Sequence, residues 1–213
     1  KKFVHYFEWG SKFIHFYDVQ KGGQNKVALE IDFKIPKFCW TVVTDEGWIF
    51  CIGGWHQDNV CCDWMLEYNS TLKTLYYRSP LLFRRSDFTA LYSERGLIYV
   101  IGGNDAKSFY NACEKYDIQN DIWSWIADLN VAWDSAASCI INNKYIYVFS
   151  GRTKFEKKEI TDTIEMYDID LNHWKMIILN PKSIWTACDL AMCMPIDNKT
   201  ILLFGGFDKT SWT

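Results

Sequence analysis

The chain has 213 residues, of which 49% are hydrophobic and 23% are charged, and its formal net charge is −3. This composition excludes a disordered chain, which would contain far fewer apolar residues. A folded chain of this length buries about 70% of its unfolded surface, so its core needs neither disulfides nor metals. No apolar run approaches the ~20 residues that span a bilayer, and the start at Lys1 lacks the features of a signal peptide. We expect a folded chain without a membrane helix, in which Lys1 is an internal residue of a longer protein.

Charge and cysteine spacing limit the partners and the compartment. The 26 acidic and 23 basic residues form no long run of one sign, so nucleic acid is not an expected partner. The eight cysteines contain no CxxC pair, which argues against a zinc or thioredoxin-like site and favours reduced thiols in the cytoplasm. The adjacent Cys61 and Cys62 leave two interpretations open, free thiols in a loop or a soft-metal site, and we favour the first.

The N-terminal segment introduces a pattern that returns along the chain. Aromatic residues make up 17% of the sequence, which favours packed sheets. Phe16-Tyr17-Asp18-Val19 is predicted to be a strand, and Trp9-Gly10 precedes it. This segment is the weakest copy of the pattern.

Four later apolar runs end in a doublet of small residues. The doublets are Gly53-Gly54, Gly102-Gly103, Ser150-Gly151 and Gly205-Gly206, and they recur every 49, 48 and 55 residues. Each run is short, rich in β-branched and aromatic residues, and apolar without alternation. These properties predict strands buried on both faces.

A second mark follows two of the doublets. Tyr116 and Tyr167 are each followed seven residues later by a tryptophan, Trp123 and Trp174, across a polar segment typical of a hairpin turn. The unit of Gly53-Gly54 keeps Tyr68 but has Leu75 where tryptophan is expected. A further strand precedes each doublet strand, so the repeating unit is predicted to contain four strands.

These doublets, tyrosines and tryptophans resemble the repeats of the kelch family of β-propellers. The resemblance implies an all-β fold, a β-propeller built of four-stranded antiparallel kelch blades that forms an incomplete ring in this chain. We expect one propeller segment over residues 1–213, with a partial blade at 1–34, blades at about 35–83, 84–131 and 132–180, and a partial blade at 181–213.

The repeat residues have a structural explanation. Glycine at the end of an inner strand permits a positive φ and close backbone approach, and large rings fill the gap between twisted blades. We therefore assign a packing role, and no ligand, to Gly53, Gly54, Gly102, Gly103, Tyr116, Trp123, Gly151, Tyr167, Trp174, Gly205 and Gly206.

Catalysis is not expected. Some propellers of this family are enzymes, such as the copper-dependent galactose oxidase, but the four histidines here lie at different positions of different units. No nucleophile elbow, phosphate-binding loop or HExxH helix is present. We predict a non-enzymatic protein with no catalytic residue, no metal and no cofactor. The alternative is a propeller enzyme or a carbohydrate-binding domain.

The expected function is recognition of a protein or peptide partner on the loop-rich face, as a scaffold or substrate-recognition module, within a larger assembly. Tryptophan and arginine are common hot-spot residues, and the loop after Gly151 is longer than its counterpart after Gly103. The candidate contact residues are Trp55, Arg85, Trp133, Arg152, Lys154 and Trp185. Rings packed between blades, and a plainly solvated basic loop, remain alternatives. We expect a cytoplasmic protein, which includes association with the cytoskeleton, and no contact with a membrane; the composition suits a protist.

Overall fold

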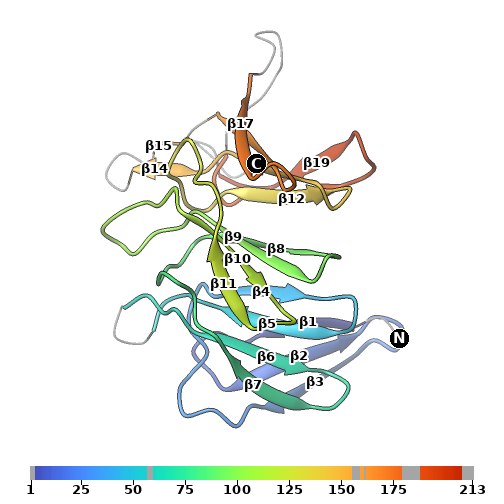
Figure 1. Cartoon of the computed structure of the whole chain (residues 1–213). Coiled ribbons are helices and arrows are strands. Elements are labelled where there is room, and N and C mark those ends of the chain that lie inside the picture. The colour runs from blue at the N-terminus through green and yellow to red at the C-terminus, as the bar shows by residue number, and fades with distance from the viewer. Residues whose placement is uncertain (1–2, 57–59, 155–158, 161, 179–187, 208–213) are drawn as a thin grey trace. The chain divides into compact units, whose positions relative to one another are not determined.

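The computed structural model describes residues 3–56, 60–154, 159–160, 162–178 and 188–207. Within these ranges the secondary structure consists of strands, without helices (Figure 1). The chain divides into two compact units, Lys1–Ser86 and Asp87–Thr213, each of which is described by itself.

The first unit contains two antiparallel sheets. The three-stranded sheet has the order β1-β2-β3, and the four-stranded sheet has the order β4-β5-β6-β7. Their strands are β1 (Phe3–Phe7), β2 (Phe13–Asp18), β3 (Gly23–Ala28), β4 (Trp40–Val43), β5 (Trp48–Ile52), β6 (Met65–Asn69) and β7 (Thr74–Arg78).

The second unit contains two further four-stranded antiparallel sheets and two two-stranded ones. The four-stranded sheets consist of β8 (Thr89–Ser93), β9 (Leu97–Ile101), β10 (Cys113–Asp117) and β11 (Ile122–Trp125), and of β12 (Ala137–Ile141), β13 (Tyr145–Phe149), β16 (Ile164–Asp168) and β17 (His173–Ile177). The two-stranded sheets are β14 (Arg152–Lys154) with β15 (Glu159–Ile160), and β18 (Met192–Pro195) with β19 (Ile201–Phe204).

The predicted fold class is confirmed. The four apolar runs before the doublets form β5, β9, β13 and β19. In each four-stranded sheet, the run is the second strand and pairs with the first and third in a simple antiparallel meander. This all-β arrangement is the topology of a propeller blade.

Turn chemistry repeats at the hairpin between the last two strands of each three- or four-stranded sheet. A side-chain oxygen accepts hydrogen bonds from the backbone N–H groups two and three residues later, which closes the turn. The residues that supply this oxygen are Asp18, Asn69, Asp117 and Asp168. Four residues after each of them a residue takes a positive φ, namely Gly22, Lys73, Asp121 and Asn172.

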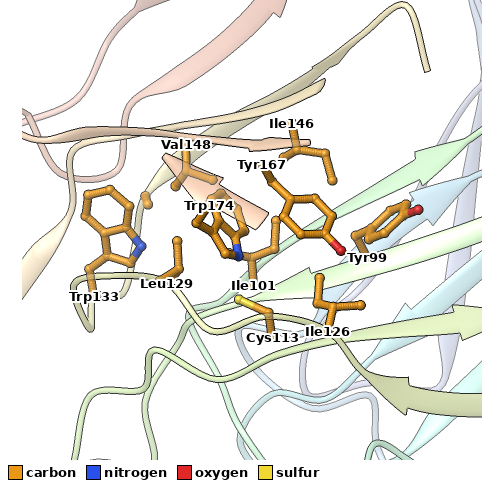
Figure 2. Close-up of a cluster of buried hydrophobic side chains, with 11 residues drawn as sticks. Tyr99, Ile101, Cys113, Ile126, Leu129, Trp133, Ile146, Val148, Tyr167 and Trp174 are labelled. Carbon is orange, nitrogen blue, oxygen red and sulfur yellow. The ribbon is translucent and has the colours of Figure 1, made fainter. Parts of the chain in front are cut away.

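A buried cluster of the second unit shows how its two four-stranded sheets pack. Ile146 and Val148 of β13 point toward Ile101 and Cys113 of the neighbouring sheet, with Trp174 beside them (Figure 2). All five side chains are at most 3% exposed. Burial of such side chains is the main source of stability where two sheets pack face to face.

One strand departs from its prediction. The run at β19 was expected to be buried on both faces, but Leu202 is 45% and Phe204 is 44% exposed. Within the described residues, β19 pairs only with β18, so its sheet offers fewer neighbours than the four-stranded sheets that bury β5, β9 and β13.

Candidate interaction surface at the doublet ends of the strands

The glycine doublets allow backbone segments to meet at the loop ends of the sheets. A Cβ on Gly102 would lie 2.7 Å from the carbonyl oxygen of Trp133, and φ of Gly102 is +64°. The N–H of the next residue, Gly103, donates to that same oxygen at 2.9 Å. Gly102 is therefore required both for its φ and for the close approach of the linker that contains Trp133.

Three residues that follow a doublet, Trp55, Arg152 and Phe207, are held by backbone pairing to the linker that enters the sheet. In the first unit, the N–H of Trp55 donates to the carbonyl oxygen of Lys37 at 2.6 Å, and the N–H of Lys37 donates back at 2.9 Å. Trp55 itself is half-buried. The N–H of Gly54 also donates to the carbonyl oxygen of Arg85, which brings the backbones of two predicted contact residues together.

Two exposed aromatic rings lie close to this pairing. Trp9 and Phe38 have ring centroids 5.0 Å apart and are 50% and 48% exposed. Phe38 directly follows Lys37, and its φ is +55°. A β-branched or bulky residue rarely adopts such a φ, so the linker holds this ring outward at a cost in backbone strain. Trp9, Phe38 and Trp55 are named the aromatic patch below.

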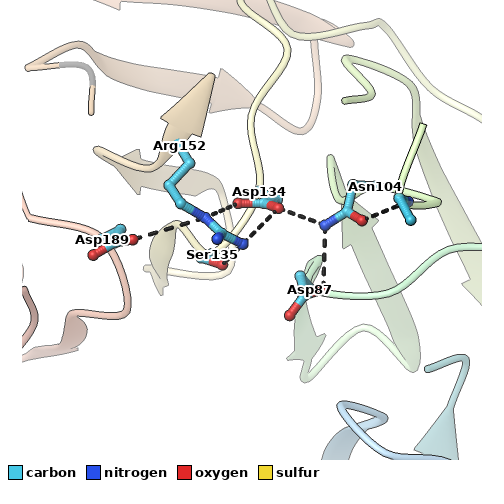
Figure 3. A network of polar contacts seen from close by, with 7 residues as sticks. Asp87, Asn104, Asp134, Ser135, Arg152 and Asp189 are labelled. Atoms are coloured by element: carbon cyan, nitrogen blue, oxygen red, sulfur yellow. Dashed lines mark hydrogen bonds and ion pairs between the residues drawn. The ribbon is translucent and has the colours of Figure 1, made fainter. Parts of the chain in front are cut away.

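In the second unit the residue at the position of Trp55 is Arg152, and its partner in the linker is Asp134. Their backbones exchange two hydrogen bonds of 3.0 Å. Arg152 Nε and Nη2 also donate to the two carboxylate oxygens of Asp134, at 2.9 Å each, which makes the pair bidentate (Figure 3). The guanidinium is 30% exposed, whereas the carboxylate is fully buried.

The network extends to both sides of this pair. Asn104 Nδ2 donates to Asp134 and to Asp87, and Asp189 lies 3.7 Å from Arg152 Nε (Figure 3). Burial raises the pKa of the Asp134 carboxyl to about 6, although Arg152 opposes this shift. The Arg152 guanidinium is thus mostly bonded to residues of this chain. Only its exposed edge is accessible to a partner.

The other predicted contact residues occupy different environments. Arg85 is fully buried and Trp133 is 1% exposed, which agrees with the packing alternative that the sequence left open. Lys154 belongs to β14, and the hairpin of β14 and β15 accounts for the length of the loop after Gly151. Trp185 lies outside the described residues. Contacts between any of these residues and a partner stay a prediction.

The aromatic marks of the repeat lie inside the blades. Tyr116 pairs with Trp123 across β10 and β11, and Tyr167 pairs with Trp174 across β16 and β17, with ring centroids 4.9 Å apart in both. The four rings are at most 6% exposed. Trp174 Nε1 donates to the carbonyl oxygen of Ala127 at 2.8 Å.

Sequence reasoning missed Asp134, Asn104, Phe38 and the exposure of Trp9. A signal for Asp134 existed, because Asp134 and Asp189 stand at matching positions shortly before successive first strands. The sequence shows Trp9-Gly10 only as a part of the weakest copy of the repeat. No signal distinguished Phe38 from a buried linker residue, since its exposure follows from a positive φ that phenylalanine seldom adopts.

Thiols and metals add no site here. All eight cysteines are free, and seven of them are buried. In the part of the chain that the structure describes, no group of three or more His, Cys, Asp or Glu side chains could hold a metal ion. The same part contains no helix that is long and apolar enough to cross a membrane.

Comparisons with known proteins agree with the repeat and the blade topology. The family model described as the Kelch motif matches residues 95–130. Kelch-like protein 23 of Homo sapiens is 27% identical over 158 residues, which cover 74% of this chain and 27% of that protein. Kelch repeat and BTB domain-containing protein 2 of Ectromelia virus is 24% identical over 182 residues, covering 73% of this chain and 32% of that protein.

An enzyme is also among the similar proteins. N-acetylneuraminate epimerase of Vibrio cholerae is 33% identical over 121 residues, which cover 53% of this chain and 29% of that protein. This chain therefore spans only about a third or less of the length of these curated relatives.

The four-stranded antiparallel sheets, with a doublet closing each second strand, define a protein built of propeller blades. The motif match at residues 95–130 and the similarity to kelch proteins then show that the chain contains kelch repeats.

Proposed function

We propose that this chain is a non-enzymatic interaction module that binds a protein or peptide partner through the loops at the doublet ends of its strands. The observation that carries this proposal is the aromatic patch, in which Trp9 and Phe38 are half-exposed on loops beside Trp55. Exposed tryptophan and phenylalanine on neighbouring loops provide the large apolar contact area that is typical of binding hot spots. The kelch-like relatives support a module built of kelch repeats.

The proposal extends to the whole chain. Residues 1–213 form one propeller segment with blades at about 35–83, 84–131 and 132–180, and the partner also contacts Arg152, Lys154 and Trp185. Arg85 and Trp133, being buried, hold the linkers in place. The net charge of −3 and the eight free thiols support a protein partner in the cytoplasm over nucleic acid.

Quantitative affinity purification with three forms of the protein tests this function. The forms are the unchanged chain, the double variant Trp9→Ala/Phe38→Ala, and the control Leu72→Ala, which removes a 67% exposed side chain from the turn at the opposite strand ends. A true partner is retained by the unchanged chain and the control and lost by the double variant. Titration with the purified partner should then show a loss of about 2 kcal/mol or more per hot-spot ring. Equal retention by all three folded forms would refute the proposed surface.

A second candidate function is an enzymatic or carbohydrate-binding propeller, which the similarity to the epimerase favours. Sialic acids and simple sugars would then raise the midpoint of thermal unfolding in a concentration-dependent manner. A non-enzymatic interaction module shows no such effect.

A further inference from the structure

The repeat tyrosine of the β4–β7 sheet differs from its counterparts in the bonding of its hydroxyl. The Tyr116 hydroxyl donates to Asp121 Oδ1 at 2.6 Å, and the Tyr167 hydroxyl donates to Asn172 Oδ1 at 2.8 Å. In both hairpins the acceptor comes five residues after the tyrosine and has a positive φ. This local bond satisfies a hydroxyl that the packing of the blades removes from water.

Tyr68 lacks such an acceptor. The residue five positions later is Lys73, which keeps the positive φ of the turn but carries no acceptor atom on its side chain. Tyr68 is 2% exposed, and its hydroxyl has no hydrogen-bond partner within the described residues. A buried hydroxyl without a partner is destabilising, so such a group in a native structure calls for an explanation, such as a bound water, a bound ligand or stored strain.

The Tyr68 side chain lines an open cavity of about 1050 Å³ in the first unit. The walls come from the face of the β1–β3 sheet and from the turns at residues 44–47 and 70–73. These turns lie at the opposite ends of the strands from the aromatic patch. The cavity is as large as the sites that hold cofactors and drug-sized molecules.

The sheet face contributes mainly apolar side chains to the wall of the cavity, whereas the turns contribute the polar residues Thr44, Asp45, Ser70, Thr71 and Lys73. Phe16 contacts Tyr68, with ring centroids 5.8 Å apart, and His5 meets the Phe16 ring edge-on at 4.9 Å. Val27, Val43 and Lys73 also line the space. Burial lowers the pKa of His5, which favours the neutral form of its ring.

We propose that this cavity binds a small molecule with a flat apolar ring and an acceptor oxygen, such as a carboxylate, to which the Tyr68 hydroxyl donates. The ring lies against Phe16 and the valines, where stacking and burial stabilise it. The acceptor provides what Asp121 and Asn172 provide in the other hairpins. This site is distinct from the aromatic patch and independent of the proposed protein partner.

Indole-3-carboxylate is a suitable probe, because it combines an aromatic ring with a carboxylate. Isothermal titration calorimetry should show saturable binding to the unchanged chain. Methyl NMR spectra should show shifts at Val27 and Val43 and none at Val148, which is buried in the other unit. No saturable binding, or saturable binding without shifts at Val27 and Val43, would overturn the proposal.

Variants distinguish the contribution of the Tyr68 hydroxyl to binding from that of the rest of the cavity. Tyr68→Phe should lower the affinity for the probe by roughly tenfold or more, since one hydrogen bond to a charged acceptor is lost. The matched control Tyr167→Phe, whose hydroxyl is already bonded to Asn172, should leave binding unchanged. Circular dichroism on both variants shows whether the fold persists. Unchanged binding in folded Tyr68→Phe would overturn the role of the hydroxyl.

A third variant acts in the opposite direction. Lys73→Asn supplies the acceptor that Asn172 supplies in its own hairpin, at a positive φ that asparagine tolerates. This variant should raise the midpoint of thermal unfolding of the free protein. It should lower the affinity for the probe at least as much as Tyr68→Phe does. A chain that gains stability yet binds the probe with undiminished affinity would contradict the proposed contact.

Discussion

Arg152 and Asp134 are joined by four hydrogen bonds, two between their backbones and two between their side chains. The pair connects the residue after the doublet with the linker that leads into β12. Because the carboxylate is fully buried, the guanidinium that neutralises it is a structural requirement before it is a binding group.

Replacing Arg152 by lysine should lower the free energy of unfolding by about 2 kcal/mol, since lysine cannot form the bidentate contact with the buried Asp134 carboxylate. Urea denaturation of both proteins measures this difference. Arg95→Lys is the matched control, because the side chains of the Arg95–Asp170 pair are 43% and 47% exposed, so water screens their attraction and the loss should be much smaller. Equal losses in the two variants would mean that burial does not decide the strength of these pairs.

The pH dependence of stability should reveal Asp134. Its pKa in the folded chain is about 6, above the ordinary value of 3.8, so the folded state binds the proton more tightly than the unfolded state does. The resulting stabilisation is fully present below pH 3.8 and is lost as the pH rises through 6. Carboxyl NMR should show one aspartate titrating near pH 6, and Asp134→Asn should lack that transition. An Asp134 signal that titrates below pH 4 would contradict this assignment.

Loss of a repeat tryptophan should destabilise its blade. Trp174→Ala removes a ring that is 3% exposed together with its hydrogen bond to Ala127, and should cost about 3–5 kcal/mol. Trp125→Ala, at a position that is 54% exposed, should change stability by about 0.5 kcal/mol or less. Chemical denaturation distinguishes the two. A small effect at Trp174 would show that the neighbouring residues close the cavity.

Gly102 should tolerate a side chain less well than a glycine of an open turn does. Gly96→Ala introduces strain at φ +77° but meets no atom within 4 Å, so its cost should be about 1–2 kcal/mol. Gly102→Ala has a similar φ and in addition places a Cβ 2.7 Å from the carbonyl oxygen of Trp133, so it should cost clearly more. Thermal unfolding of the two variants provides the comparison. If the two variants lose the same free energy of unfolding, the close approach at Gly102 does not contribute to stability.

The repeat could be predicted from the sequence because its marks are local. Gly102 and Gly103 follow from backbone geometry at one strand end, and the spacing of Tyr167 and Trp174 follows from one hairpin. These constraints act over a few residues, so they appear as fixed spacings. The topology of the blades then follows from antiparallel pairing of short apolar strands.

The candidate site could be predicted only in part, because it depends on contacts between distant segments. Trp133 has the residue type of a hot spot, yet packing within the second unit buries it. Arg152 has the charge of a binding residue, yet its carboxylate partner lies 18 positions earlier in the chain. The missing acceptor of Tyr68 is visible as Lys73 in the sequence, but only the structure shows that the hydroxyl is buried.

The loops after the doublets can vary in length without changing the pairing of the strands that flank them. Each loop is closed at its base by a backbone hydrogen bond, from Gly53 to Trp64, from Gly102 to Ala112 and from Ser150 to Thr163. The strands on either side therefore have the same pairing whatever the length of the loop, as the additional hairpin after Gly151 illustrates. Each loop can therefore change in length or sequence without altering the blade that carries it. The binding specificity of such a protein can evolve by insertion and deletion in these loops alone.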